Sequence, residues 1–412
     1  MQNLHYIKLL ALVFTFFSGF VNANSLKSLL QSTLQTAPEI LEAEANVDAS
    51  SNRTEQAKAG HWPIVSVTGN SILNQYHRNS SDSKSRFTPG VKAEMNLYAF
   101  GAIDKEIERN VKEEEFYQQK YVSTQEELAY TVSQLYLQAL NLKNAIKVMK
   151  DSLARHKSIL GSIDVIIDND GGRLSEYVQV EARMLAVEQN INRYNKQLAT
   201  TLNSLSKYSN SKITEKSLKD PFLGLTDNLL QQKYTNKDKS QNPSYKAQQA
   251  ELEAKRLAVE AQSKKDLPKV NLVGYATRDD HYIGVEVSWD IVNRGSRYSV
   301  QEKEIEAYAA RQRLDRLSRD IDEISQQSLI NIKESRAQLK TLKSQIKASA
   351  KVVDFYQMQF DIARRTLLDV LNAERDLAEV ELAHVNAESD LSMGILDYLY
   401  SQGAIATWLN SK

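Results

Sequence analysis

Side chains that commonly carry chemistry are few and scattered in this chain. It has no cysteine in 412 residues, which removes disulfides, thiolate metal sites, cysteine nucleophiles and a lipid-modified cysteine. None of its six histidines stands at metal-ligand spacing: they are His5, His61, His77, His156, His281 and His384. The sequence contains no Gly-rich phosphate loop and no nucleophile motif. We therefore predict a non-enzymatic protein without catalytic residues, bound metal or cofactor.

The charge balance excludes another class of function. Lys and Arg together number 52, as do Asp and Glu, so the formal net charge is zero. No basic excess is available to neutralise phosphates, and nucleic-acid binding is not expected. With only 6 Pro and 14 Gly, the chain is predicted to be helix-rich, with few turns and long elements.

Residues 1–23 have the pattern of a secretory signal peptide. Lys8 precedes an apolar run over residues 9–20, and Val21-Asn22-Ala23 supplies the small residues favoured before signal-peptidase cleavage. We expect the mature chain to begin at Asn24. The alternative is a transmembrane anchor, but roughly a dozen apolar residues fall short of the ~20 that a spanning helix needs.

An internal duplication organises the rest of the sequence. Pro38 and Pro63 lie 25 residues apart, and Pro243 and Pro268 repeat that spacing 205 positions later. Two further pairs of segments correspond at offsets of 194 and 193: 97–101 with 291–295, and 175–181 with 368–374. One supersecondary unit is therefore present twice. We assign a first structural repeat to 24–210, a connecting, equatorial segment to 211–242 and a second repeat to 243–412.

Each repeat is predicted to run helix, β-hairpin, long helix, long helix. The elements expected in the first are a helix over 26–60, a hairpin over 64–98 with strands 64–76 and 88–98, and helices over 102–168 and 174–208. Those expected in the second are a helix over 244–266, a hairpin over 269–290 with strands 269–278 and 282–290, and helices over 296–362 and 366–402. The polar segment up to residue 242 shows no strong periodicity. Helices of about 67 residues reach roughly 100 Å, far beyond a single globular core.

The predicted strands alternate between apolar and polar side chains. The apolar set, which points to one face, consists of Val91, Ala93, Met95 and Leu97. The polar set, which points to the opposite face, consists of Lys92, Glu94, Asn96 and Tyr98. This alternation suits either a half-buried soluble sheet or a barrel wall with lipid outside and water inside. The signal peptide, the strand lengths and the aromatic residues at the strand ends favour the barrel. Because the smallest outer-membrane barrels have about eight strands, four strands imply a barrel shared between subunits.

In this arrangement the chain resembles the TolC-like outer-membrane efflux protein family, over essentially the whole mature sequence. The resemblance rests on the duplicated Pro-to-Pro helices, the strand exit at 97–101 and the tip segments 172–176 and 365–373. It implies a mainly α fold with a small β part, in which a homotrimer forms a twelve-stranded outer-membrane β-barrel from four strands per chain. A periplasmic α-helical coiled-coil tunnel would continue that barrel. The resemblance also implies three partners: outer-membrane lipid, a periplasmic adaptor (membrane fusion) protein, and an inner-membrane transporter, ABC-type or proton-driven.

The same resemblance implies a gate where the helices meet at the periplasmic tip. Asp369 matches an acidic position at the pore, and Asn372 stands where some members carry a second acid. Arg365 matches a basic residue that ties the inner helix to positions matching Ser175 and Glu176. The closing network of this chain is therefore expected to involve these five residues.

Two departures from the family pattern and a docking region complete this expectation. Phe360 replaces a frequent tyrosine and Ala363 a frequent glycine, which predicts a weaker or differently wired closing network. The residues expected to dock the adaptor are Gly171, Gly172, Arg173, Leu174, Arg364 and Thr366.

The favoured function is a passive exit conduit, most consistent with type I protein secretion. The tip at 171–179 is similar to members that serve such systems, and the missing lipid cysteine excludes the lipoprotein drug-efflux branch. Small-molecule or drug efflux stays open as the alternative, because many drug pumps use unlipidated channels. A periplasmic coiled-coil adaptor or structural protein fits less well, since an adaptor needs one helical hairpin flanked by Gly-rich β domains.

Overall fold

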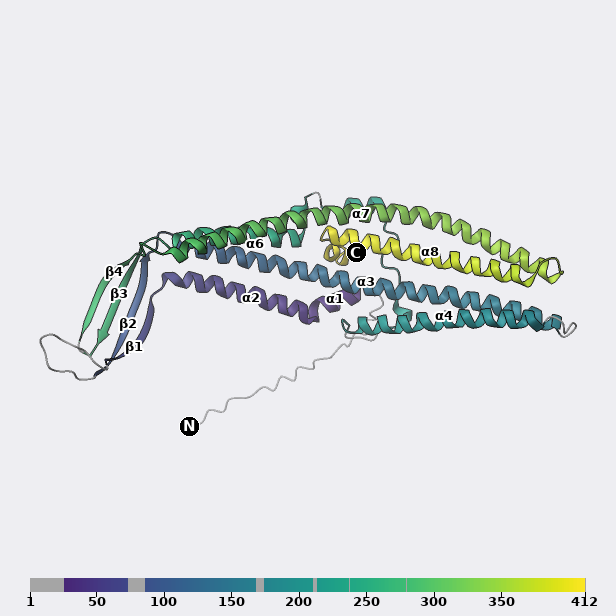
Figure 1. Ribbon diagram of the computed structural model, residues 1–412, viewed down its shortest axis with the longest axis horizontal. Coiled ribbons are helices and arrows are strands. Elements are labelled where there is room, and N and C mark those ends of the chain that lie inside the picture. Colours follow the sequence, from purple (N-terminus) through teal and green to yellow (C-terminus); the bar gives the residue numbers. More distant parts are fainter. Residues whose placement is uncertain are drawn as a thin grey trace, which may run out of the picture.

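The computed structural model describes residues 26–72, 86–167, 174–209, 213–236, 238–278 and 280–411. Within these ranges the chain forms an elongated body, with a small sheet at one end and two helical hairpins reaching the other end (Figure 1). The predicted signal peptide at 1–23 lies outside the described residues.

The two repeats contain matching elements in the same order. The first consists of α2 (Pro38–Lys58), β1 (Ile64–Ile72), β2 (Arg86–Tyr98), α3 (Ala102–Ile167) and α4 (Leu174–Ser206). The second consists of α6 (Pro243–Lys264), β3 (Lys269–Thr277), β4 (His281–Ser288), α7 (Arg294–Asp361) and α8 (Leu367–Ser401). The long helices α3 and α7 have 66 and 68 residues, and α4 and α8 have 33 and 35. The predicted duplicated, mainly helical fold with a four-stranded sheet is confirmed.

Short elements gather midway along the body. These are α1 (Leu26–Thr36), α5 (Asp227–Tyr234), α9 (Ile405–Leu409) and the 3-10 turns η3 (Glu215–Ser217) and η4 (Lys239–Gln241), all of them additions to the repeat. A further 3-10 turn, η1 (Ala59–His61), lies at the sheet end, between α2 and β1. The segment over 211–242, in which no strong periodicity was found, therefore includes a short helix and two helical turns. The boundaries drawn at 210 and 243 stay a prediction.

The single helix predicted over 26–60 is wrong, because the chain breaks it at Ala37. That residue has extended backbone angles (φ −67°, ψ 132°), and α2 begins with Pro38 at its first position. A proline has no N–H to donate and disfavours helical angles in the residue before it. Pro38 therefore ends α1 and starts α2, as Pro243 starts α6 in the other repeat.

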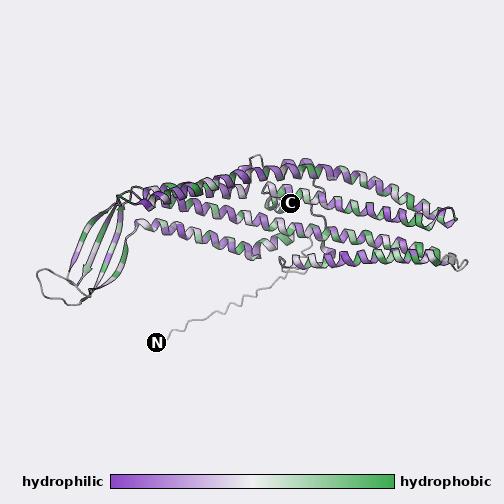
Figure 2. Cartoon of the chain, viewed as in Figure 1, coloured by the Kyte–Doolittle hydropathy of each residue, from purple (hydrophilic) through white to green (hydrophobic). Residues whose placement is uncertain are grey.

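The sheet is antiparallel throughout, in the order β1-β2-β3-β4. Paired residues share a face, so the register places Asn96, Asn271 and Glu286 on one side. On that side Lys92 Nζ lies 2.8 Å from Glu94, and Asn96 donates to Asn271 over 2.8 Å. The opposite side carries mainly aliphatic side chains, and the alternation is visible along the strands in Figure 2.

One detail of the predicted strands is wrong. The register shifts between Asn96 and Tyr98, where a β-bulge inserts one extra residue. Tyr98 pairs with Val270, which pairs with Val287, so Tyr98 lies on the aliphatic side rather than on the charged side. In addition, β1 ends at Ile72, and the rest of the predicted strand, residues 73–76, lies outside the described residues.

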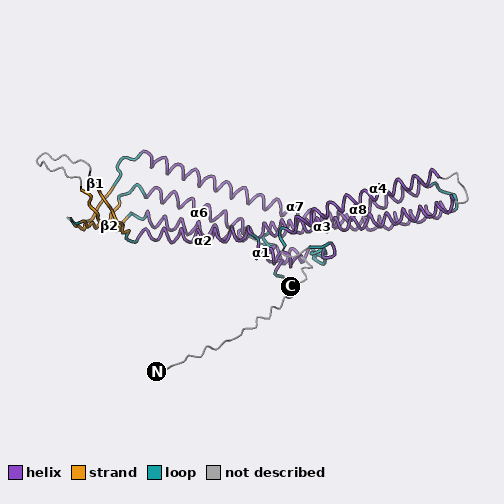
Figure 3. The backbone as a smooth tube through the Cα atoms, turned by 90° about the horizontal axis from the view of Figure 1, so that it is seen from below, coloured by secondary structure: helices purple, strands orange, loops and turns teal. Residues whose placement is uncertain are grey.

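Next to the sheet the helices form a wall one layer thick. Helix α3 packs between α2 and α6, and α7 packs on the far side of α6. Toward the other end α4 pairs with α3, α8 pairs with α7, and contacts between α3 and α8 join the two hairpins (Figure 3). None of the helices in the described part of the chain has the length and apolar content of a membrane-spanning helix.

The largest apolar core lies midway, where α1, α5 and α9 pack on α3 and α8. A buried carboxylate fixes α9 there: Glu126 of α3 accepts the backbone N–H groups of Ile405 (2.9 Å) and Ala406 (2.8 Å). Burial raises the pKa of Glu126, and the two N–H donors oppose that rise. The C-terminal turn is thereby held against the middle of α3.

Helices α7 and α8 end in the same hydrogen-bonding motif but with different residues. After α8, Ala404 N–H donates to Leu399 O and Gly403 N–H to Tyr400 O, with φ +61° at Gly403. After α7, the corresponding left-handed residue is Ala363, at φ 58°. Glycine adopts this conformation freely, whereas an L side chain is strained in it. The turn between α7 and α8 is therefore closed at a conformational cost.

We expect Ala363→Gly to stabilise this turn by about 1 kcal/mol, because the left-handed strain of alanine exceeds the entropy that glycine adds to the unfolded chain. Hydrogen exchange of the Arg364 amide, which donates to Gln359 O over 2.8 Å, should slow about fivefold. The control is Gly403→Ala, which should destabilise its own turn because a Cβ there would overlap Pro243. Faster exchange in Ala363→Gly would contradict this account.

Candidate functional site at the helical tip

The turn between α7 and α8 and the first turns of α8 hold three of the five residues singled out for the gate, Arg365, Asp369 and Asn372. Thr366 caps α8: its hydroxyl accepts the Asp369 N–H, and the Asp369 carboxylate accepts the Thr366 N–H (3.2 Å) and hydroxyl (2.8 Å). These bonds, the hydroxyl first, hold the pKa of Asp369 below its usual range. Within one chain Asp369 is thus a half-buried, ionised carboxylate at a helix N-terminus.

Arg365 lies against the end of α7. Its Nε donates to Gln359 Oε1 over 3.1 Å, and its guanidinium lies 4.3 Å from the ring centre of Tyr356. Its Nη1 is 3.9 Å from the Asp369 carboxylate, a long ion pair between partly exposed groups. Such a pair is weak in water, so the stacking on Tyr356 fixes the arginine at least as much.

A surface hollow at the tip brings the two hairpins together. Glu176 of α4 lines it with Arg365 and Asp369, and the remaining lining residues are Gln359, Ala363, Arg364 and Thr366. Three of the five residues expected in the gate therefore share one site. Ser175 lies exposed on α4 beside it, and Asn372 is half-buried one turn along α8 from Asp369. The gating roles of all five stay a prediction.

The expected docking residues fall into two groups. Leu174, Arg364 and Thr366 are exposed at the tip, where an approaching partner would meet them. Gly171, Gly172 and Arg173 lie outside the described residues.

Phe360 anchors an apolar cluster behind the turn. It is 1% exposed and packs with residues of α3, α4 and α8: Ile159, Ile163, Val180, Leu367, Val370 and Leu371. A phenyl ring suits this site because it brings no hydroxyl that would need a partner. The departure from tyrosine thus adds apolar packing beneath the gate residues.

The sequence alone indicated neither the partners of Arg365 nor an ionic contact that joins α3 to α8. Tyr356 and Gln359 lie in the last turns of α7, and Arg365 lies in the turn after that helix. Nothing in the spacing of these residues indicates that the arginine folds back onto the helix end. The Thr-x-x-Asp pattern at 366–369, by contrast, is a capping box that could have been found. Arg155 of α3, paired with Glu374 and Glu381 of α8, was also missed.

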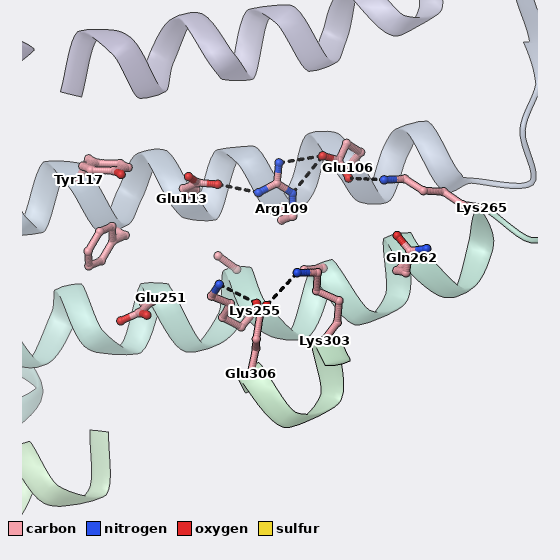
Figure 4. A pocket seen from close by; sticks show the side chains of 13 residues that line it. Glu106, Arg109, Glu113, Tyr117, Glu251, Lys255, Gln262, Lys265, Lys303 and Glu306 are labelled. Carbon is pink, nitrogen blue, oxygen red and sulfur yellow. Dashed lines mark hydrogen bonds and ion pairs between the residues drawn. The ribbon is translucent and has the colours of Figure 1, made fainter. Parts of the chain in front are cut away.

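A second hollow lies near the sheet, between α3, α6 and α7 (Figure 4). Its charges neutralise one another: Arg109 bridges Glu106 and Glu113, and Glu306 accepts from Lys255 and Lys303, both at 2.9 Å. Those two lysines, Lys255 first, lower the pKa of Glu306 to about 2. The hollow is thus a set of ion pairs that ties α7 to α6 and stiffens α3.

Comparison with known proteins gives one family and several solved structures. Residues 29–211 and 236–392 match the family model described as "Outer membrane efflux protein". No curated protein matches the sequence.

Three solved structures have the same fold at low sequence identity. The outer-membrane channel OprN superposes with a TM-score of 0.79 at 17% identity, covering 93% of this chain and 90% of that one. The outer membrane protein VceC from Vibrio cholerae gives 0.81 at 15%, covering 92% and 96%. The open state of the MtrE outer membrane channel of Neisseria gonorrhoeae gives 0.76 at 14%, covering 92% and 88%.

Proposed function

The chain belongs to the outer membrane efflux protein family, and from this premise we propose that three copies form a passive exit conduit gated at the helical tip. The protein is a non-enzymatic outer-membrane efflux channel whose helical part extends into the periplasm. The observation that carries the trimeric proposal is the incomplete wall: the described part of one chain supplies four strands and, next to them, a single layer of helices, which together enclose no lumen.

The edges of that wall support assembly with identical copies. Strands β1 and β4 are the edges of the sheet, so each leaves one row of backbone hydrogen-bonding groups for another strand. Helices α2 and α7 are the corresponding edges of the helical wall. Large apolar side chains stay exposed along α7 and at the residue that follows it: Tyr298, Ile305, Tyr308, Ile330, Phe355, Met358 and Ile362. A second copy would cover them and continue both the sheet and the wall.

The two faces of the sheet indicate which side of the proposed barrel would face lipid and which would face the lumen. Val67 and Ile283 are 84% and 83% exposed on the aliphatic side, an arrangement that is costly in water and favourable against lipid. Trp62 and Trp289, also exposed, stand where the strands meet the helices, the level of an interfacial aromatic belt. The side with Lys92, Glu94 and Asn96 would then line the water-filled lumen.

For the cargo we propose polypeptide export of the type I kind, through docking of an adaptor and an inner-membrane transporter at the tip. The similarity of 171–179 to members that serve such systems and the absence of a lipid cysteine support this proposal. Loss of a secreted polypeptide from the medium of a deletion strain would support it. Unchanged secretion with increased drug sensitivity would instead favour small-molecule efflux.

Assembly and conduction test the proposal directly. Purified in detergent, the mature chain should have the mass of a trimer, because a single chain leaves the outer edges of β1 and β4 without a neighbouring strand. Added to planar bilayers, it should produce discrete ion-conducting channels. A stable monomer that forms no channels would overturn the proposed architecture.

We expect Arg365→Ser to open the tip, raising single-channel conductance on the order of twofold. The substitution removes the stacking on Tyr356 and the bonds to Gln359 and Asp369 that hold the turn. Arg364→Ser is the matched control, since Arg364 is also exposed in the same turn. An unchanged conductance in Arg365→Ser would show that the arginine does not close the tip.

Three copies of Asp369 around one axis would make a ring that favours cations. We expect Asp369→Asn to reduce cation selectivity and to abolish block by divalent or trivalent cations added from the periplasmic side, and Asn372→Asp to strengthen that block. Thr366→Ala is the control, because it breaks the capping box but keeps the carboxylate. If Thr366→Ala reproduces the loss, helix capping rather than pore charge explains it.

A further inference from the structure

The seam between the two hairpins, where α3 packs on α8, alternates between apolar and charged contacts along its length. Close to the tip it is apolar, with Ile163 of α3 and Val370 of α8 in one buried cluster. Farther from the tip it is apolar again, where Met149 of α3 packs with Ala378 of α8. Arg155 lies between these clusters along α3 and introduces a charge into the seam.

Arg155 holds two carboxylates of the opposite hairpin. Its Nε donates to Glu374 Oε1, and its Nη2 and Nη1 donate to the two oxygens of Glu381 over 2.9 and 3.4 Å. Glu374 and Glu381 lie seven residues apart on α8, which puts both on the face toward α3. One guanidinium therefore spans two turns of α8, with the planar fork geometry that only arginine offers.

Burial of the Glu374 carboxylate in this arrangement is energetically unfavourable. Its side chain is 0% exposed, and its Oε2 has no hydrogen-bond partner among the residues that the structure describes. Burial raises the pKa of Glu374, against the lowering effect of Arg155. An apolar pair of the same volume would join two helices at least as stably, so stability alone does not explain an ion pair here. Ionic contacts inside apolar seams are best attested as devices of register or switching.

We propose that Arg155 is a positioning residue of the gate, whose ion pairs with Glu374 and Glu381 clamp α8 onto α3 while the tip is closed and part when it opens. This inference rests on the proposed function, in which the tip is a gate. Glu374 lies only about 10 Å along α8 from Leu367, so the clamp fixes the helix segment that carries Asp369 and Asn372. Parting returns the buried carboxylate to water, which lowers the cost of the open state.

Single-channel recording of Arg155→Met tests the clamp. The variant leaves Glu374 buried without its partner in the closed tip, and the open fraction should rise about tenfold or more. The double variant Arg155→Met/Glu374→Met replaces the pair by apolar side chains and should return the open fraction to that of the unaltered protein. A purely structural role predicts lower thermal stability of the Arg155→Met trimer with unchanged gating, and that result would overturn the clamp.

Two comparisons keep the test decisive. Arg313→Met breaks another ion pair between helices, with Glu251 of α6, far from the tip, and should leave gating unchanged. If Arg155→Met does not assemble, Glu381→Gln removes only the outer carboxylate: a smaller rise in open fraction supports the clamp, and no rise overturns it. Unaltered protein that forms no channels overturns the proposed function itself, whereas conducting trimers indifferent to Arg155→Met and to Glu381→Gln overturn only the clamp.

Discussion

A wall one helix thick cannot surround its own apolar side chains. Among the described elements next to the sheet, β2, β3, α3 and α6 have neighbours on two sides and are open on the other two, whereas β1, β4 and α2 have a neighbour on one side only, as has α7 where it packs on α6. Its apolar residues therefore divide between seams inside the chain and surfaces that only lipid or another copy can cover. The equatorial core, where α1, α5 and α9 pack on the long helices, is the exception and gives the chain its largest internal anchor.

Where no apolar core is available, charge pairing holds the wall together. The ion pair of Glu306 with Lys255 joins α7 to α6, and Arg53 of α2 pairs with Glu113 of α3 over 3.0 Å. Each such pair contributes little by itself, since its groups stay partly exposed. Distributed along helices of roughly 100 Å, they fix the order and register of neighbours without requiring a thick interior.

The sequence predicted features that depend on local or periodic signals and missed those that depend on contacts across the fold. The paired prolines and the alternating strands revealed the duplicated unit, because spacing alone encodes them. The break at Ala37 was also encoded by Pro38 but was overlooked, and the bulge that turns Tyr98 to the aliphatic side leaves no mark on the alternation itself. At the tip, Asp369 and Arg365 were found through family resemblance. Glu374 was not, since its partner Arg155 lies more than two hundred positions away.

The distribution of polar and apolar contacts also agrees with the proposed position of the gate at the tip. Opening at the equator would expose the largest apolar core and free the buried carboxylate of Glu126 from the two N–H groups of α9. Near the tip the hairpins share a smaller apolar cluster, in which Phe360 packs with Ile163 and Val370, and the turn at Ala363 is strained. The ionic contacts of Arg155 and Arg365 can exchange for water, whereas apolar contacts cannot. The proposed gate thus lies where the hairpins share a small apolar cluster and ionic contacts, away from the largest apolar core.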